Sequence, residues 1–503
     1  MKKKADSPPS LPASPAPPGQ AAILLALGMT ATFVAVLSLR PVMSVDVGYH
    51  LAYGEQFLRT GQIVDSSEFI YTCDPSLAPA RRPEPGPGCW YDQNGEYRFP
   101  NANWLSQVIM ALTHRLGGMR ALSILTAAMV VATMAAAFTA MRRCGVGTLA
   151  SAGGVVLAAL AGYERFNMRP ELPGYLVLLI QVAILVPAAG AGRTISRRAL
   201  VAIVALQILL VNLHSYFLLA LAMTGAVLAD RLARSLWRRL VVRNGQEADP
   251  LAGQTGRLAI LLAAQTAACL VNPWTWRLAI LPVQTLLYLR RHHVSAAAGG
   301  EHPWANIVEF YPTFTAGAFS APIVMGVYVT ILALAGAGIL AAVWRRRWAW
   351  AGILAGAAAV SCSMRRNISV TSAVMACVAL ASLWHLIAPR LGRKSRPEWL
   401  GMAMAAGLAV VSMALAVSVV SQRFYAWEGS SYRFGVGIDR VWTPLAAAEW
   451  INANQPAGRL WTDANVSSNM CYFTRPHRWV PSLTNTWAYP PATFKESLEL
   501  VAG

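Results

Sequence analysis

A carboxylate and an imidazole, four residues apart, open an acidic loop directly after the first hydrophobic stretch of the chain. Eight of the 23 acidic residues fall between Ser44 and Asn103, and Asp46 and His50 begin this region. A carboxylate at the mouth of a membrane bundle can act as a general base. A histidine one helical turn along lies on the same face, where it can orient the base or bind a polar group of a substrate. Asp46 could instead only cap the amphipathic helix predicted at 46–60.

The composition of the chain is that of a membrane protein. Of its 503 residues, 55% are hydrophobic and only 13% are charged. Apolar runs of about 15–25 residues alternate with short polar stretches, a pattern that predicts an all-α polytopic membrane protein with about eleven crossings. The predicted spans are 21–43, 121–141, 147–162, 174–188, 199–229 (a hairpin of two short helices that turns at 212–214), 258–271, 322–343, 349–361, 369–387 and 401–420.

Basic residues are distributed over many short clusters beside the predicted spans. The clusters are Lys2–Lys4, Arg142–Arg143, Arg193–Arg198, Arg231–Arg243, Arg345–Arg347 and Arg390–Arg396. The positive-inside rule places such clusters, and the N-terminus with them, on the cytoplasmic side. An odd number of crossings then leaves the segment after Val420 outside the cytoplasm. Because the +19 net charge is dispersed in this way, no nucleic-acid partner is predicted.

Two pairs of arginines fall on the outer side, against this rule. They are Arg165 and Arg169, within the segment 164–171, and Arg365 and Arg366. Guanidinium groups bind phosphate bidentately and stay charged when partly desolvated, so an anionic ligand is one explanation. Pairing with the acidic residues of 164–171 or with lipid headgroups is the alternative, and it is favoured for Arg165. The second pair has no acidic neighbour in sequence, so phosphate binding is the prediction there.

The chain divides into a transmembrane domain, residues 21–420, and several segments outside the bilayer. Residues 1–20 are rich in Pro, Ser and Ala and are expected to form a disordered cytoplasmic tail. Two long outer loops are predicted, the first at 44–103 and the second at 272–321. Residues 421–503 are polar and rich in Trp, Tyr and Asn, which predicts an extracytoplasmic C-terminal domain.

Local patterns give further predictions for these segments. An amphipathic helix at 104–116 is expected to return the first outer loop to the membrane. The C-terminal domain shows a helical pattern at 446–451 and a strand pattern at 459–462, so we expect a small α/β unit. A fragment of such a unit is the alternative, because the chain stops soon after an apparent helix start. Cys73 and Cys89 share the first outer loop, where a disulfide would suit an oxidising exterior; two free thiols are the alternative.

Seven short motifs occur along nearly the whole chain, all on its predicted outer side. They are Asp46–His50 (with Gly54 or Gly61 as a following glycine), Phe69–Thr72, Asn101–Leu105, Arg169–Pro170, Asn212–Ser215, Asn272–Pro273 and Arg365–Asn367. In this set the chain resembles the bacterial GT-C-type membrane glycosyltransferases, the superfamily that includes protein O-mannosyltransferases, arabinosyltransferases and lipid A sugar transferases. The resemblance implies a GT-C-like fold in the bacterial inner (plasma) membrane.

The resemblance also implies a reaction. A sugar would move from a polyprenyl-phosphate donor to an acceptor hydroxyl on the extracytoplasmic side, with Asp46 as base and His50 orienting it or binding sugar hydroxyls. The residues implied for substrate and phosphate binding are Arg169, Asn212, His214, Arg365, Arg366 and Asn367. A structural role for His214 in its hairpin is the alternative. The sequence does not identify the acceptor.

Three further polar residues are secondary candidates, namely Asp65, Glu68 and Asn103. The two carboxylates could assist the base or bind a divalent cation, although a helix cap or a solvated loop charge is favoured for each. The sequence has no His/Cys spacing of the metal-ligand type, so it specifies no metal or other cofactor.

The sequence departs from the resembled pattern at three positions. Ala102 and Asn103 occupy places where a His-Glu pair is common, and Ser67 stands where an Asp is common. A degenerate, non-catalytic membrane scaffold is therefore an alternative to the enzyme. A transporter or flippase of lipid-linked saccharides is another alternative. It would want polar residues at mid-membrane and two related halves, whereas the predicted spans are mostly free of charge at mid-depth and the sequence shows no internal repeat.

Overall fold

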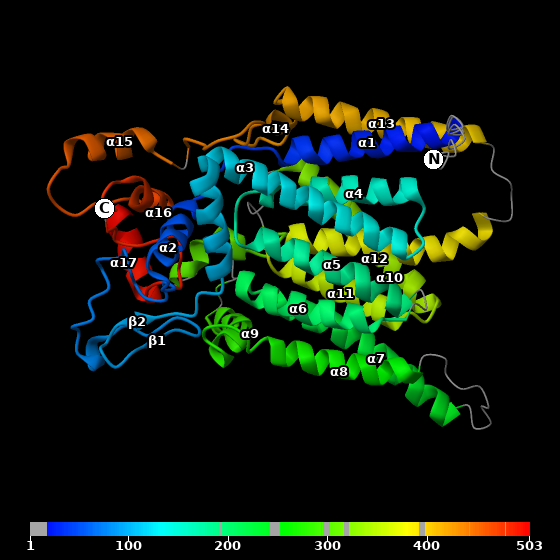
Figure 1. Ribbon diagram of the computed structural model, residues 1–503, viewed down its shortest axis with the longest axis horizontal. Helices are drawn as coiled ribbons and strands as arrows, with labels where there is room; N and C mark the ends of the chain where they lie inside the picture. Colours follow the sequence, from blue (N-terminus) through cyan, green and yellow to red (C-terminus); the bar gives the residue numbers. More distant parts are fainter. Residues whose placement is uncertain are drawn as a thin grey trace, which may run out of the picture.

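The structure, a computed structural model, is mostly helical. It describes residues 18–190, 194–241, 252–292, 294, 302–315, 321–391, 398–441, 443–477 and 479–502. Figure 1 shows a bundle of helices that run side by side and, at one end of it, a smaller lobe that contains α2 (Val47–Thr60) and α16 (Ala464–Phe473). The start of α1 (Pro18–Ser38) lies at the opposite end of the bundle.

All the predicted spans are helical. The bundle comprises α1, α3 (Trp104–Arg143), α4 (Thr148–Gly162), α5 (Glu171–Gly190), α6 (Arg197–Leu213), α7 (Phe217–Val241), α8 (Ala252–Ala268), α10 (Pro322–Trp344), α11 (Trp348–Ser363), α12 (Ile368–Leu391) and α13 (Glu398–Val420). Six described helices are long and apolar enough to cross a membrane: α1, α3, α5, α10, α12 and α13. The chain is therefore a membrane protein. The count of about eleven crossings stays a prediction, because the other helices are shorter or more polar.

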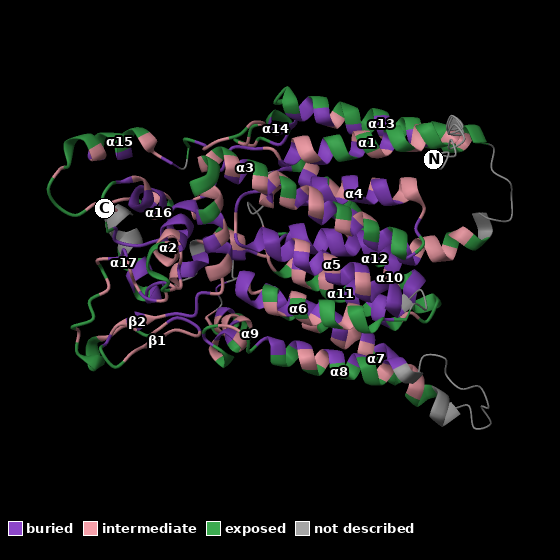
Figure 2. Ribbon diagram, in the orientation of Figure 1, coloured by how far each residue is buried: buried purple, intermediate pink, exposed green. Residues whose placement is uncertain are grey.

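The interior of the bundle is formed by α5 and α12. Most of each apolar window is buried there, whereas α1, α10 and α13 expose most of theirs, as the burial colours of Figure 2 show. Val410 and Leu340 are examples of these exposed apolar side chains. A helix that is apolar on all sides can expose such residues only to lipid at little cost, so the outer helices are expected to face the bilayer.

The described members of the predicted cytoplasmic basic clusters gather at the end of the bundle away from the lobe, whereas Lys2–Lys4 and most of Arg390–Arg396 lie outside the described residues. The Arg234 guanidinium donates to the Arg346 carbonyl, which joins the end of α7 to the turn after α10. Arg345 donates to the His385 carbonyl at 3.2 Å, and the His385 ring Nε2 lies 2.8 Å from the Cys144 carbonyl. The arginines that opposed the charge rule lie at the other end, beside α2.

Helix boundaries differ from the predictions at several places, of which α1 and α3 are two. Helix α1 begins at Pro18 and ends at Ser38, so the last residues of the predicted 1–20 tail are helical and the span does not reach Met43. Pro41 explains its end, because a helix is disfavoured at the residue before a proline. The amphipathic segment 104–116 and the following span form one element, α3, which is kinked where Gly118 takes a φ of 61°.

The lobe is built partly from the two outer loops. The first contains α2 and a two-stranded antiparallel sheet, β1 (Trp90–Tyr91) and β2 (Tyr97–Arg98), with Trp90 opposite Arg98. The second contains α9 (Trp276–Arg291) and two 3₁₀ turns, Pro303–Asn306 and Val308–Phe310. Cys73 and Cys89 are free thiols, and the Cys89 thiol donates to the Trp487 carbonyl, so no disulfide joins them.

The C-terminal segment corrects the prediction of a small α/β unit. Its described residues form α14 (Arg423–Trp427), α15 (Leu445–Asn454), α16 and α17 (Pro491–Ala502), joined by irregular chain. Helix α15 confirms the predicted helix at 446–451, but 459–462 forms no strand. The segment instead contributes single bridges, Ile438 with Val42 and Val480 with Ile70, to the loops beside it. The strand pattern at 459–462 did not produce a strand, because these residues pair with no other strand of the described part of the chain.

Glycine permits the close crossing of α2 and α16. The Gly48 N–H donates to the Asn469 side-chain oxygen at 2.9 Å. A Cβ at Gly48 would lie only 2.0 Å from the Ser468 carbonyl oxygen. On the other side of α2, a Cβ at Gly54 would lie 2.2 Å from the Gln107 carbonyl oxygen of α3. The C-terminal segment is thereby held directly against the helix that follows Asp46.

Candidate functional site

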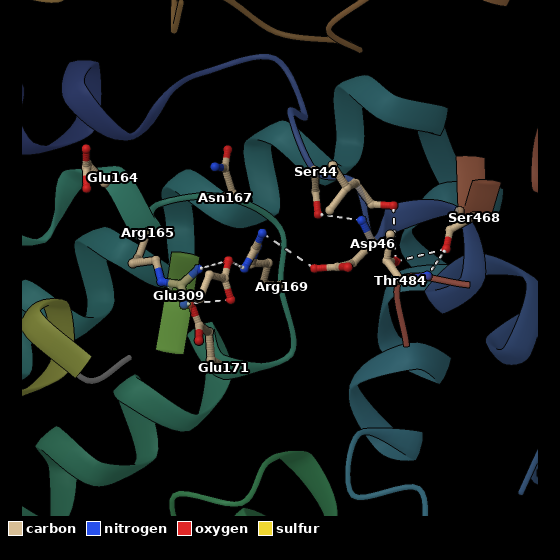
Figure 3. A network of polar contacts seen from close by, with 12 residues as sticks. Ser44, Asp46, Glu164, Arg165, Asn167, Arg169, Glu171, Glu309, Ser468 and Thr484 are labelled. Carbon is tan, nitrogen blue, oxygen red and sulfur yellow. Dashed lines mark hydrogen bonds and ion pairs between the residues drawn. The ribbon is translucent and has the colours of Figure 1, made fainter. Parts of the chain in front are cut away.

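A chain of ion pairs joins the start of α2 to the loop between α4 and α5. The Asp46 carboxylate lies 3.5 Å from the Arg169 guanidinium, and Arg169 donates to Glu309 at 2.6 Å. Arg165 also binds Glu309, at 2.8 Å, and lies 3.3 Å from Glu171. Figure 3 shows Arg169 between the Glu309 and Asp46 carboxylates, with Thr484 beyond Asp46. Segments distant in sequence thus meet at one charged centre.

Two cavities lie on either side of this centre. The larger has a volume of about 660 Å³ and the smaller about 380 Å³. Both are lined by Asp46, Arg169, Glu309, Arg366 and Thr484, which we call the shared wall. A group bound in one cavity and a group bound in the other would therefore meet across the same carboxylate and guanidinium groups.

The larger cavity lies between the bundle and the C-terminal segment. Its charged lining comprises Asp46, Glu164, Arg165, Arg169, Glu309, Arg365 and Arg366. Buried residues from the ends of α4, α10 and α12 close it on the bundle side, among them Val324 and Ile368. Of its lining residues, Val308 and Asn465 are the exposed ones, so it opens beside α16 and the second outer loop.

The smaller cavity is more apolar at its mouth. His50, His214 and Tyr216 line its interior, together with Asn103. The exposed members of its lining are Leu218, Leu286 and Ser363, which belong to the outer end of α7, to α9 and to the outer end of α11. This cavity therefore opens where the bundle helices end.

Asp46 has the properties of a carboxyl base. Its side chain is 19% exposed, and although it immediately precedes α2 it makes no capping hydrogen bond, so the capping role considered from the sequence is not seen. Burial raises the pKa of Asp46 above its usual value, and the Glu309 charge adds to this; Arg169, a hydrogen bond from Thr484 and Arg165 oppose it. A raised pKa brings a carboxyl base closer to neutral pH, where proton transfer is most effective.

For Glu309, the effects of burial and of neighbouring charges on the pKa have the opposite outcome. Burial alone would raise its pKa, but Arg165 and Arg169 together hold the pKa of Glu309 well below its usual range. The same carboxylate raises the pKa of both arginines, against the effect of burial. Glu309 therefore stays ionised and fixes Arg169 beside Asp46, whose own pKa burial raises.

His50 is buried beside Asp46 in the smaller cavity. Burial, with Arg169 and His214 nearby, holds the pKa of His50 well below its usual value, so the ring is neutral. The Gln107 amide lies 3.3 Å from Nδ1 and its oxygen accepts from Asn101 at 2.8 Å. This fixed amide donates to Nδ1, which leaves the ring proton on Nε2. His50 is thus held as a neutral hydrogen-bonding group.

His214 is also neutral. Burial lowers its pKa to about 3, and the charges of Arg366 and Arg165 contribute. Its ring packs on Tyr216, with centroids 4.4 Å apart, and Nδ1 is buried without a hydrogen-bond partner among the residues that the structure describes. A buried ring nitrogen without a partner costs stability unless a ligand or water meets it. This favours a binding role over a purely structural one.

The two arginines of the Arg365–Asn367 motif have different surroundings. Arg365 donates to both oxygens of Glu164, the shorter contact being 2.9 Å, so its acid partner comes from another loop. Arg366 stacks over Phe310 at 5.3 Å, and no acidic side chain of the described part of the chain pairs with it. Its Nε is buried without a partner. Asn367 is held by Val360 and Tyr216.

Three of the predicted polar residues line neither cavity. The Asn212 amide accepts from the Trp104 indole at 2.9 Å and donates to Val271, which ties α6 to its neighbours. Asp65 pairs with Arg98 at 2.8 Å, and Glu68 accepts from Gln56 at 2.6 Å. These groups stabilise the lobe at a distance from the charged centre.

Sequence reasoning missed two members of the shared wall. Glu309 lies in the second outer loop, and Thr484 lies in the C-terminal segment without any motif around it. For Glu309, an isolated acid in an aromatic outer loop was the available signal. Tyr432 of the larger cavity was missed too; its hydroxyl donates to the Glu164 carbonyl at 3.1 Å. Within the described ranges, no three His, Cys, Asp or Glu side chains are placed to hold a metal ion.

No protein-family model matches the chain, and no curated protein sequence matches it either. Some solved structures, in contrast, are similar to the chain. The oligosaccharyltransferase of Archaeoglobus fulgidus in its apo form is similar with a TM-score of 0.57 and 11% identity, over 93% of this chain and 65% of the archaeal one. The same enzyme tethered to an acceptor peptide gives a TM-score of 0.50 and 12% identity, over 94% and 60% of the two chains.

The two proteins share a fold. The mostly helical fold of this chain is thus similar to that of the archaeal oligosaccharyltransferase. At this level of identity the likeness concerns the fold alone. The chain spans less than two thirds of the archaeal enzyme's length, 65% in one match and 60% in the other.

Proposed function

We propose that this protein is a membrane glycosyltransferase that moves a sugar from a polyprenyl-phosphate donor to an acceptor hydroxyl on the extracytoplasmic side of the bacterial plasma membrane. The observation that carries the proposal is the shared wall. There a carboxyl group of raised pKa lies beside arginines, one of them without an acidic partner, between two cavities. The likeness of the fold to a GT-C enzyme agrees with it.

The reaction needs a base on one side of the anomeric carbon and positive charge on the other. Asp46 takes the proton of the acceptor hydroxyl as its oxygen bonds to the anomeric carbon. The bond between that carbon and the phosphate oxygen breaks, and both its electrons leave with the phosphate. Arg366 stabilises the negative charge that develops there, as fixed cations do for departing anions. Arg169 is held by Glu309 and contributes from the same wall.

The donor fits the smaller cavity better than the larger. Its mouth at Leu218 and Leu286 can pass an isoprenoid chain toward the bilayer, while Arg366 and the neutral His214 meet the phosphate inside. The acceptor then approaches through the larger cavity, which opens at Asn465 beside the C-terminal segment. Asp46 faces both cavities, as a group shared by the two substrates must.

Glu309 bears on the alternative of a degenerate scaffold. The missing His-Glu pair at Ala102 and Asn103 suggested lost activity, but the fold brings a second carboxylate, Glu309, to the centre from another loop. The enzyme is therefore favoured over the scaffold.

The test compares Asp46→Asn with wild type in membranes supplied with a radiolabelled polyprenyl-phosphate sugar. Loss of the base should reduce transfer by about 10²–10⁴-fold. Asp65→Asn is the matched control, because this carboxylate pairs with Arg98 outside both cavities and its loss should leave the rate nearly unchanged. Equal transfer by wild type and Asp46→Asn would remove Asp46 as the base.

A further inference from the structure

Arginines from two elements meet at the end of the bundle that lies away from the lobe (Figure 1). Arg345, Arg346 and Arg347 form the turn between α10 and α11, and Arg234 lies on α7. The Arg234 guanidinium donates to the Arg346 carbonyl, which holds this turn against α7. Arg345 donates to a carbonyl of α12 at 3.2 Å, so its position is fixed as well. We call Arg234, Arg345 and Arg347 the arginine cluster.

The arginine cluster has little negative charge to balance it. Arg234 pairs with Asp230 at 3.0 Å. Arg345 and Arg347 pair with no carboxylate in the part of the chain that the structure describes. Burial and the nearby charges of Arg345 and Arg234 lower the pKa of Arg347 below its usual value. Like charges that are held so close together destabilise the protein unless an anion lies among them.

Arg347 is also incompletely hydrated. Its guanidinium stacks over the buried Trp350 ring at 4.6 Å, and Nη1 is buried without a hydrogen-bond partner among the described residues. Water therefore reaches only the other edge of this group. A guanidinium that has lost part of its hydration still keeps its charge and binds phosphate oxygens through parallel N–H groups. An arginine that only sets the orientation of a membrane span needs no such burial, so the environment of Arg347 favours a bound anion.

Exposed tryptophans place the arginine cluster at the level of lipid headgroups. Trp344 and Trp348 flank the turn and are 79% and 48% exposed, and tryptophan is enriched where hydrocarbon meets headgroups. Leu340 lies one helical turn before Trp344 on the same face of α10 and is 73% exposed. An apolar strip thus leads from the cluster along α10, where acyl chains can pack while an anionic headgroup lies among the arginines.

We propose that the arginine cluster binds the phosphate of an anionic phospholipid, whose acyl chains lie against Leu340 and Trp344. The phosphate oxygens accept from the guanidinium groups and supply the negative charge that the surrounding side chains lack. Because Arg234 comes from α7 and Arg345 is held on α12, the bound lipid ties the ends of α7, α10 and α12 together. This site lies at the opposite end of the bundle from Asp46 and is independent of the proposed function.

Native mass spectrometry of the full-length protein tests this site. The protein, in a neutral detergent, is incubated with equal amounts of phosphatidylglycerol and phosphatidylcholine that have the same acyl chains. Wild type should retain phosphatidylglycerol in preference. Arg345→Gln combined with Arg347→Gln should lower this preference at least about five-fold, because a single arginine near a membrane surface contributes about that factor to the binding of anionic lipid.

The matched control combines Arg197→Gln with Arg198→Gln. It removes the same charge from two exposed positions at the start of α6 and should keep the wild-type lipid preference. An equal loss of preference in the two double variants would mean that the protein attracts anionic lipid through its total charge, and would overturn the site.

Thermal unfolding distinguishes a lipid from a soluble anion. Phosphatidylglycerol should raise the Tm of wild type, whereas inorganic phosphate at the same concentration should not. Equal stabilisation by inorganic phosphate would refute the lipid assignment. If the double glutamine variant does not fold, Arg347→Lys keeps the charge but lacks the parallel N–H groups and should still lower the lipid preference; an unchanged preference would overturn the proposal. None of these measurements uses sugar transfer, so their failure would leave the proposed function standing.

Discussion

At the scale of single residues, the adjacent arginines Arg365 and Arg366 are expected to have different roles. Arg365 is neutralised by Glu164 across two loops. Arg366 stacks on Phe310 and lines both cavities. A guanidinium that no carboxylate engages is available to an anionic ligand, whereas a paired one must first give up its partner.

Arg366→Ala should therefore weaken donor binding more than Arg365→Ala does. Loss of a charge-assisted contact costs about 1.5–3 kcal/mol, equivalent to about a 10–100-fold rise in the apparent donor KM. Arg366→Lys should recover part of the donor binding, because lysine keeps the positive charge but lacks the parallel N–H groups of the guanidinium. Steady-state kinetics with the polyprenyl-phosphate sugar would measure these values. If Arg365→Ala raised the apparent donor KM more than Arg366→Ala did, Arg365 and not Arg366 would be the donor-binding arginine.

Thr484 gives a prediction about pH. Its hydrogen bond lowers the pKa of Asp46, so Thr484→Ala should raise that pKa further. The base must be ionised to act, and a higher pKa means that it becomes protonated at a higher pH. The acid limb of the kcat/KM profile should therefore move to higher pH in this variant.

Thr72→Ala is the control for this profile. Thr72 donates to the Pro481 carbonyl and so also contacts the C-terminal segment, but it lines neither cavity. The acid limb of the kcat/KM profile of Thr72→Ala should coincide with that of wild type. An acid limb that shifts to lower pH in Thr484→Ala would contradict the part given to Asp46.

At the scale of elements, the position of Asp46 depends on the crossing of α2 and α16. Gly48→Ala would place a methyl group against the Ser468 backbone, which cannot move away as a flexible side chain could. Overpacking of this kind costs about 1–3 kcal/mol. We expect faster proteolysis of the C-terminal segment and a loss of transfer, because Thr484 would leave the shared wall.

Gly28→Ala is the matched variant for this prediction. It lies within α1, and a Cβ there would meet no atom within 4 Å. Its proteolysis and activity should equal those of wild type. If Gly48→Ala also left proteolysis and activity unchanged, the crossing of α2 and α16 would not determine the position of the site.

The same elements show what the sequence could and could not predict. Long apolar runs located the helices, because every backbone group must be satisfied within a helix in lipid. Charge placed Arg169 and Arg366 on the side of Asp46, but it could not reveal the Glu164 partner of Arg365, which lies about 200 positions away. The strand expected at 459–462 failed for the same reason, since pairing partners are set by the tertiary fold.

At the scale of the whole molecule, the basic clusters and the lobe lie at opposite ends of the bundle. The positive-inside rule then places Arg143 in the cytoplasm and α15 outside. A membrane-impermeant maleimide should label Glu449→Cys in intact cells and Arg143→Cys only after permeabilisation. Wild type, with its seven native cysteines, gives the background. Labelling of Arg143→Cys in intact cells and of Glu449→Cys only after permeabilisation would mean that the orientation is the opposite one, with the charged centre on the cytoplasmic side.

The Thr484 hydroxyl lies 3.4 Å from the Val45 carbonyl oxygen across 439 positions of sequence. A contact of such long range forms late, because the ribosome must release nearly all of this chain before its two halves can meet. An unfinished polypeptide would already have most of its helices in the bilayer while its carboxyl base still lacked this neighbour. The charged centre around Asp46 is thus completed only after residue 484 has been synthesised.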